Sequence, residues 1–85
     1  MRALARMRRV IDVGIAAGEV GPRFGVDLAR EVTTLLNEVD GGEPVDLVRR
    51  VERLRAAIDG RRPGEVSPDR VADLTALLAE VPVSF

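Results

Sequence analysis

The tripeptide Gly-Glu-Val occurs twice in this chain, at residues 18–20 and 64–66, and each copy stands in the same sequence context. A proline follows each valine two residues later, and an Asp-Leu pair follows at residues 27–28 and 73–74. An Ile-Asp pair precedes each copy, at residues 11–12 and 58–59. A pattern that recurs in this way marks a structural unit that is used twice. Because glycine commonly ends a helix and proline commonly begins one, the unit predicts two helical hairpins.

Four segments carry apolar residues at steps of three and four, which is the spacing of one face of an α-helix. The expected helices span residues 2–16, 22–40, 44–59 and 68–81. The third is expected to begin near Pro44, and the fourth has Ser67 as its N-cap and Pro68 at its first position. No segment alternates apolar and polar residues as a half-buried strand would, so no sheet is expected.

The predicted fold class is all-α, with residues 1–85 forming one small antiparallel four-helix bundle built from two repeated hairpins. Short connections make successive helices antiparallel neighbours, and the two hairpins must pack together to bury their apolar stripes. Leu54, at the centre of the third helix, is expected to face the first hairpin. Val20 and Val66 are expected to be buried against the helices that follow them. Phe24 is expected in the core, and Phe85 in a disordered C-terminus.

Basic and acidic helices alternate along the chain, because the first and third are rich in arginine while the second and fourth are net acidic. Each predicted hairpin therefore combines one basic helix with one acidic helix. Exposed ion pairs contribute only about 0–1 kcal/mol each. We therefore expect these charges to select the pairing of the helices and to disfavour other topologies.

The composition removes most routes to catalysis. The chain has no cysteine and no histidine, and all 13 basic residues are arginine, so the usual nucleophiles and bases are missing. Ser67 is better explained as a helix cap. The carboxylate pairs Asp27/Glu31 and Asp69/Asp73 are better explained as solvated charges, and the loop at residues 40–43 has too few ligands for calcium. We therefore expect no enzyme, cofactor, metal site or small-molecule substrate.

Arginine clusters are the strongest functional signal in the sequence. Arg49, Arg50 and Arg53 lie on one face of the third helix and form the candidate partner-binding site. Arginine suits the recognition of carboxylates and phosphates. A solvated helix face is the alternative explanation. A net charge of -1 and the lack of aromatic residues among the clustered arginines for base stacking argue against nucleic-acid binding. No apolar run is long enough for membrane insertion.

The order of helices, glycines and Gly-x-Val turns resembles a known family. It is similar to the small helical accessory domain at the C-terminal end of many actinobacterial eukaryotic-like serine/threonine protein kinases, and to the FIMAH-type domain of secreted bacterial proteins. The resemblance covers residues 4–81. It is carried by Ile11, Gly18, Val20, Leu28, Leu35, Gly42, Val51, Leu54, Ile58, Gly64, Val66, Ser67, Leu74 and Leu77. Gly25, inside the first turn of the second helix, departs from a good helix start.

The resemblance implies a non-catalytic accessory and regulatory module of a bacterial kinase, which binds a protein partner or the parent kinase. The kinase sequence motifs themselves are absent, so no catalytic residue is carried over. A stand-alone helical protein that forms a homodimer is the first alternative. An arginine-dependent binder of nucleic acid or anionic polymer is a weaker one. The resemblance implies an extracytoplasmic location if the domain follows a membrane helix, and a cytoplasmic location otherwise.

Overall fold

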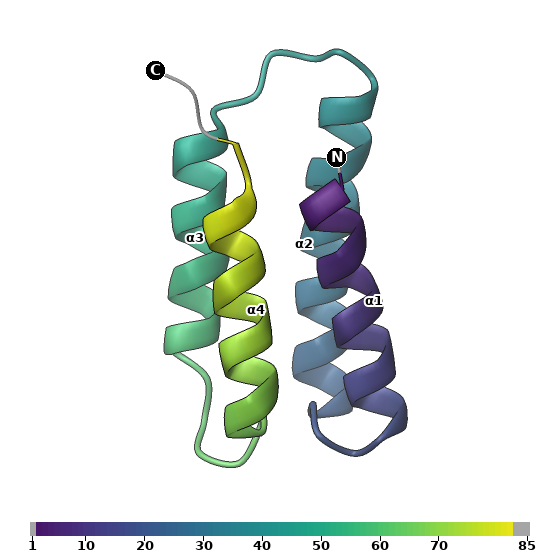
Figure 1. Cartoon of the computed structure of the whole chain (residues 1–85), viewed down its shortest axis with the longest axis vertical. Helices are drawn as coiled ribbons and strands as arrows, with labels where there is room; N and C mark the ends of the chain where they lie inside the picture. Colours follow the sequence, from purple (N-terminus) through teal and green to yellow (C-terminus); the bar gives the residue numbers. More distant parts are fainter. Residues whose placement is uncertain (1, 83–85) are drawn as a thin grey trace.

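The computed structural model describes residues 2–82 as four α-helices joined by short connections (Figure 1). The helices are α1 (Arg2–Ala16), α2 (Pro22–Asp40), α3 (Leu47–Asp59) and α4 (Pro68–Glu80). Within the described residues there is no strand, so the expected all-α class is confirmed. Met1 and Phe85 lie outside the described residues.

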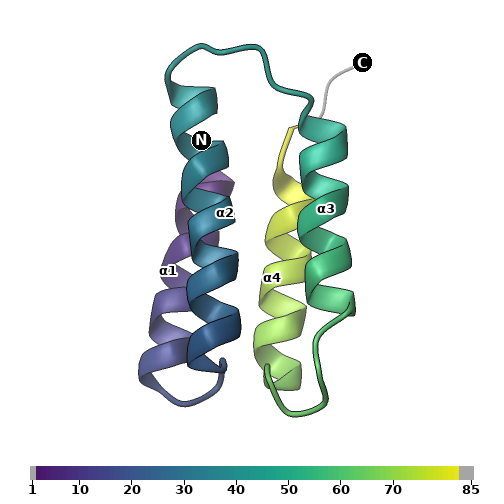
Figure 2. The same ribbon diagram turned by 180° about the vertical axis from the view of Figure 1, so that it is seen from behind.

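The two hairpins stand side by side, with α1 and α4 adjacent on one face of the bundle (Figure 1) and α2 and α3 adjacent on the other (Figure 2). The turns within the hairpins meet at one end of the bundle, and the connection from α2 to α3 crosses the other end. The apolar stripes of all four helices meet in one core, as the spacing predicts. Its fully buried members include Leu4, Met7, Ile11, Val32, Leu35, Leu54, Ile58, Leu74 and Leu78. Phe24 is only partly buried and packs against the edge of this core.

Helix α3 begins three residues later than expected, which corrects the start predicted at Pro44. Asp46 is its N-cap, and the Asp46 carboxylate accepts a hydrogen bond of 3.1 Å from the backbone N–H of Arg49. Aspartate satisfies one of the free N–H groups of a first turn, which proline cannot do. The cap therefore decides the start. At the other end of the chain, α4 stops at Glu80, and Val81 is extended because it precedes Pro82.

The two Gly-Glu-Val copies pair with each other, a contact that the repeat alone did not predict. Val20 and Val66 form an isolated antiparallel bridge. The N–H of Gly21 donates to the Glu65 carbonyl at 2.6 Å, and the N–H of Ser67 donates to the Glu19 carbonyl at 2.8 Å. Each repeat thus gives the other the same bond, and the two turns are related by an approximate two-fold axis. The glycines of both copies have positive φ angles, 74° and 85°, which other residues rarely adopt.

The side chains of the two bridging residues, Val20 and Val66, are buried, as expected. Val20 packs where two helices lack side chains. A β-carbon at Gly14 of α1 would lie 2.5 Å from Val20 Cγ2, and one at Gly25 of α2 would lie 2.6 Å from Ile15 Cδ1 and 3.0 Å from Val20 Cγ1. Gly25, which weakens the start of α2 by its propensity, therefore has a packing role. Small residues at both positions let the first turn close over the end of the core.

Candidate interaction surface

The arginine stripe, which we define as Arg49, Arg50 and Arg53, lies on the outer surface of α3, and Arg50 faces α2. Its middle member is bound within the fold. The Arg50 guanidinium forms an ion pair of 2.7 Å with Glu38 of α2, and both side chains are less than one third exposed. This pair links the two hairpins near the crossing connection. Arg50 therefore serves mainly to hold α3 in register with α2.

The two outer arginines are available to solvent. Arg49 and Arg53 are exposed, and within residues 2–82 the structure shows no hydrogen bond or ion pair from either guanidinium. They are four residues apart, so both project from the same side of α3. The structure thus divides the predicted site into one structural arginine and two exposed arginines on a rigid helix.

A small apolar pocket lies between α2 and α3, and sequence reasoning did not find it. Its volume is about 240 Å³, and it is lined by Phe24, Asp27, Leu28 and Glu31 of α2 and by Ala57 of α3. We call it the α2–α3 pocket. Asp27 and Glu31 are exposed, and the described residues offer neither carboxylate an ion pair. The i,i+4 spacing of the two acids is visible in the sequence, but the pocket also depends on how α3 sits against α2.

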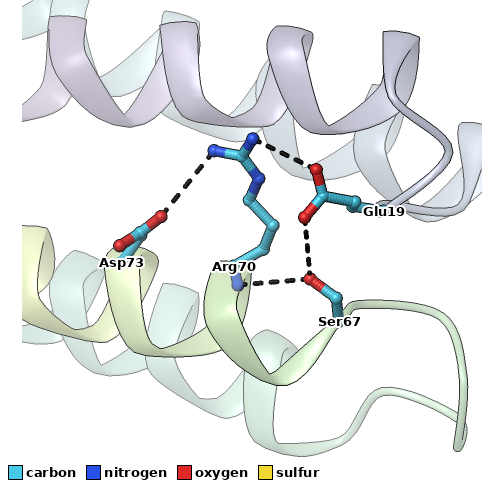
Figure 3. Close-up of polar contacts among 4 residues, drawn as sticks. All are labelled: Glu19, Ser67, Arg70 and Asp73. Carbon is cyan, nitrogen blue, oxygen red and sulfur yellow. Dashed lines mark hydrogen bonds and ion pairs between the residues drawn. The ribbon is translucent and has the colours of Figure 1, made fainter.

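A polar network ties the first turn to the start of α4 (Figure 3). Ser67 Oγ accepts a hydrogen bond of 3.3 Å from the backbone N–H of Arg70, which confirms its predicted role as N-cap. The same hydroxyl donates to a carboxylate oxygen of Glu19 at 3.3 Å. The Arg70 guanidinium lies between Glu19, at 3.3 Å, and Asp73, at 3.7 Å. Arg70 is largely buried, so this network holds the two turns together.

Ion pairs between helices also join the two hairpins. Besides the Arg50–Glu38 pair, Arg6 of α1 lies 3.7 Å from Glu80 of α4. Helices with opposite charge are neighbours around the whole bundle, because α1 contacts both α2 and α4 and α3 contacts both as well. The alternation of charge therefore serves the packing of hairpin on hairpin as well as the pairing within each hairpin.

The other polar candidates lie apart from one another. Asp69 is exposed in the first turn of α4, and Asp73 faces Arg70. A second groove, between α1 and α2, is lined by Arg8, Asp12 and Thr33 among others. There Arg8 pairs with Asp12 and donates a hydrogen bond to Thr33. Across residues 2–82, no group of three or more acidic side chains is arranged to hold a metal ion.

Comparison with family models, with curated proteins and with solved structures found no match for this chain. The resemblance to a kinase accessory domain stays a prediction. Among the described helices, none combines the length and the apolar character needed to cross a bilayer.

Proposed function

We propose that this domain is a non-catalytic protein-interaction module that docks through its arginine stripe onto an acidic surface of a protein partner. The observation that carries the proposal is the contrast within the stripe. Arg50 is fixed by Glu38 at 2.7 Å, whereas Arg49 and Arg53 extend from the same rigid helix with no partner in the described part of the chain. A pair of exposed, unpaired guanidinium groups suits the bidentate recognition of carboxylates.

The physical chemistry of exposed charges favours a binding role over a stabilising one. An exposed ion pair contributes about 0–1 kcal/mol to folding, so exposed arginines can be changed with little effect on the fold. At an interface, arginine is enriched among the residues that carry the binding energy, and charges at its rim raise the rate of association. The stripe therefore has more to contribute to a complex than to the isolated domain.

The proposed setting is that of an accessory domain of a bacterial serine/threonine kinase. Its support is the sequence resemblance together with the helical fold that the resemblance implies. In that setting the domain would bind the parent kinase or a protein that the kinase recruits. Gene context tests this directly, because the proposal expects a kinase domain to be encoded immediately upstream. A gene context without a kinase would overturn the kinase setting and leave the docking proposal in place.

The docking proposal is tested with a charge-reversal pair. Arg49→Glu/Arg53→Glu should keep the circular dichroism and melting temperature of the wild type and lose binding to its protein partner in a titration. The matched control is Arg9→Glu/Arg55→Glu, which reverses two exposed arginines, one on α1 and one beside the α3–α4 groove. The control should bind as the wild type does. If the folded stripe variant binds its partner equally well, the stripe is a solvated face. Salt-dependent retention of nucleic acid in a gel shift would instead favour the anionic-polymer alternative.

A further inference from the structure

We propose that the face formed by α2 and α3 binds the same face of a second copy of this chain, with the α2–α3 pocket of each copy receiving arginines from the stripe of the other. This inference rests on the proposed function, because it names the partner that Arg49 and Arg53 meet. It follows from the repeat, from the placement of charge along the face and from symmetry.

The pocket lies where the second repeat has an arginine and the first does not. In the alignment of the two repeats, Phe24 stands at the position of Arg70, and Asp27 at the position of Asp73. Arg70 fills its corner and contacts the carboxylates of Glu19 and Asp73. The first repeat keeps the carboxylate of Asp27 but has a phenyl ring in place of the guanidinium, and a pocket opens there. The first repeat therefore has the carboxylate of an ion pair, that of Asp27, but lacks the arginine that would pair with it.

The chemistry of the pocket suits an arginine side chain. Its volume of about 240 Å³ is below the ~300–1,000 Å³ of typical small-molecule sites, so it admits a side chain more readily than a separate ligand. Phe24, Leu28 and Ala57 would cover the aliphatic part of the arginine, and the phenyl ring would attract the guanidinium. The carboxylates of Asp27 and Glu31 stand at the same pocket to accept its N–H groups.

The α2–α3 face has a basic end and an acidic end. The Arg50–Glu38 pair fixes the register of the two helices, which run in opposite directions (Figure 2). With a rise of about 1.5 Å per residue, Glu31 and Asp27 lie about 10 and 16 Å along α2 from the level of this pair. By the same measure, Arg53 lies about 5 Å along α3 toward the pocket, and Arg49 about 2 Å in the opposite direction. The unpaired charges of opposite sign are therefore offset along the face, by about 6 Å between Arg53 and Glu31 and by about 18 Å between Arg49 and Asp27.

The exposed Arg23, four residues before Asp27, borders the acidic end, whereas other neighbouring charges lie elsewhere. Arg30 lines the groove between α1 and α2, whereas Glu52 and Arg55 line the groove between α3 and α4. Those three side chains thus belong to other sides of the bundle. Asp46, at the basic end, accepts a hydrogen bond from the backbone N–H of Arg49 and so is engaged as the cap of α3. The guanidinium groups of Arg49 and Arg53 are left for a partner.

Symmetry selects a second copy as that partner. A two-fold dimer uses the same patch on both subunits, so the patch must be complementary to itself. A face with one basic end and one acidic end meets this condition when the two copies lie antiparallel, because each basic end then covers the acidic end of the other copy. An unrelated acidic partner would complement the arginines but would oppose Asp27 and Glu31.

Sedimentation equilibrium of the full chain tests the proposal with two charge-reversed variants. The wild type should form dimers whose dissociation constant rises with sodium chloride. Asp27→Arg/Glu31→Arg and Arg49→Glu/Arg53→Glu should each weaken dimerisation at least about tenfold, since like charges would then face each other. Mixing the two variants in equal amounts should restore dimers, because every contact across the mixed interface joins opposite charges. The control Arg9→Glu/Arg55→Glu, which changes exposed arginines away from the α2–α3 face, should dimerise as the wild type does.

Several results would overturn the proposal. The wild type could stay monomeric, or the two variants could dimerise as tightly as the wild type. The mixture of variants could stay monomeric, or the control could lose as much dimer affinity as the variants do. Circular dichroism checks that each variant folds. If one double variant does not fold, the fourfold exchange Asp27→Arg/Glu31→Arg/Arg49→Glu/Arg53→Glu, which preserves net charge, should dimerise alone. A monomeric wild type whose binding to another protein still depends on Arg49 and Arg53 would overturn self-association but not the proposed function.

Discussion

At the scale of single residues, the first turn is built around missing side chains. Gly14 makes room for Val20, whose backbone is held by the bridge to Val66, and Gly25 makes room for Ile15 and Val20. Two effects of replacing Gly14 oppose each other. Alanine favours a helix over glycine by up to about 1 kcal/mol, whereas overpacking a buried site costs about 1–3 kcal/mol. Because valine is stiff and Val20 is 1% exposed, overpacking should prevail.

We therefore expect Gly14→Ala to lower the free energy of unfolding by about 1–2 kcal/mol, the reverse of its effect in an exposed helix. Chemical denaturation followed by circular dichroism measures this change. In a Val20→Ala background the same substitution should become neutral or stabilising, because the obstructing methyl group is gone. If Gly14→Ala costs the same in both backgrounds, its effect does not arise from contact with Val20.

At the scale of secondary structure elements, local sequence signals were sufficient for most boundaries. Proline and serine at residues 67–68 predicted the start of α4, and glycine predicted the ends of α1 and α3. The start of α3 was predicted wrongly because Pro44 and Asp46 are both signals for a first turn. Which of two such signals prevails depends on the path of the incoming chain. That path is set by contacts of α3 with the rest of the bundle, which local sequence does not contain.

The two N-caps, Asp46 of α3 and Ser67 of α4, can be compared by what each contributes to the free energy of unfolding. Asp46→Ala should lower the free energy of unfolding by about 1 kcal/mol, the usual effect of losing an N-cap. Ser67→Ala should cost more, since its hydroxyl also donates to Glu19 across the turns. Urea denaturation of both variants measures the two losses in the free energy of unfolding. Thr75→Ala, at an exposed position within α4, is the control. Equal losses would indicate that the Ser67–Glu19 hydrogen bond contributes nothing to stability.

At the scale of the whole molecule, the hairpins depend on each other. The repeat predicted two equal units and their packing, but not that their turns pair or that a pocket opens between α2 and α3. Both features join residues that are far apart in the chain, so they depend on the register of one hairpin against the other. The positions of Asp27, Glu31 and Arg53 along their helices could be read from the sequence. Their placement on one face could not.

Neither hairpin should fold alone. Each would expose the apolar stripe that the other covers, and each would leave a backbone carbonyl of the bridge without its partner. Peptides of residues 1–41 and 44–85 should show weak helical signals separately, because short helices are marginal without tertiary packing. Mixing them should restore the circular dichroism of the intact chain. A strongly helical, cooperatively melting hairpin would contradict this dependence.

The reciprocal bridge between Val20 and Val66 also bears on the ancestry of the chain. Two identical hairpins, each carrying one Gly-Glu-Val turn, would form the same pair of backbone bonds as a dimer. Duplication of a gene for one hairpin, with fusion across Gly41 and Gly42, would turn that dimer into a single polypeptide without changing its contacts. Once fused, the two corners could evolve separately. One corner has its arginine at residue 70, and the other has Phe24 and a pocket.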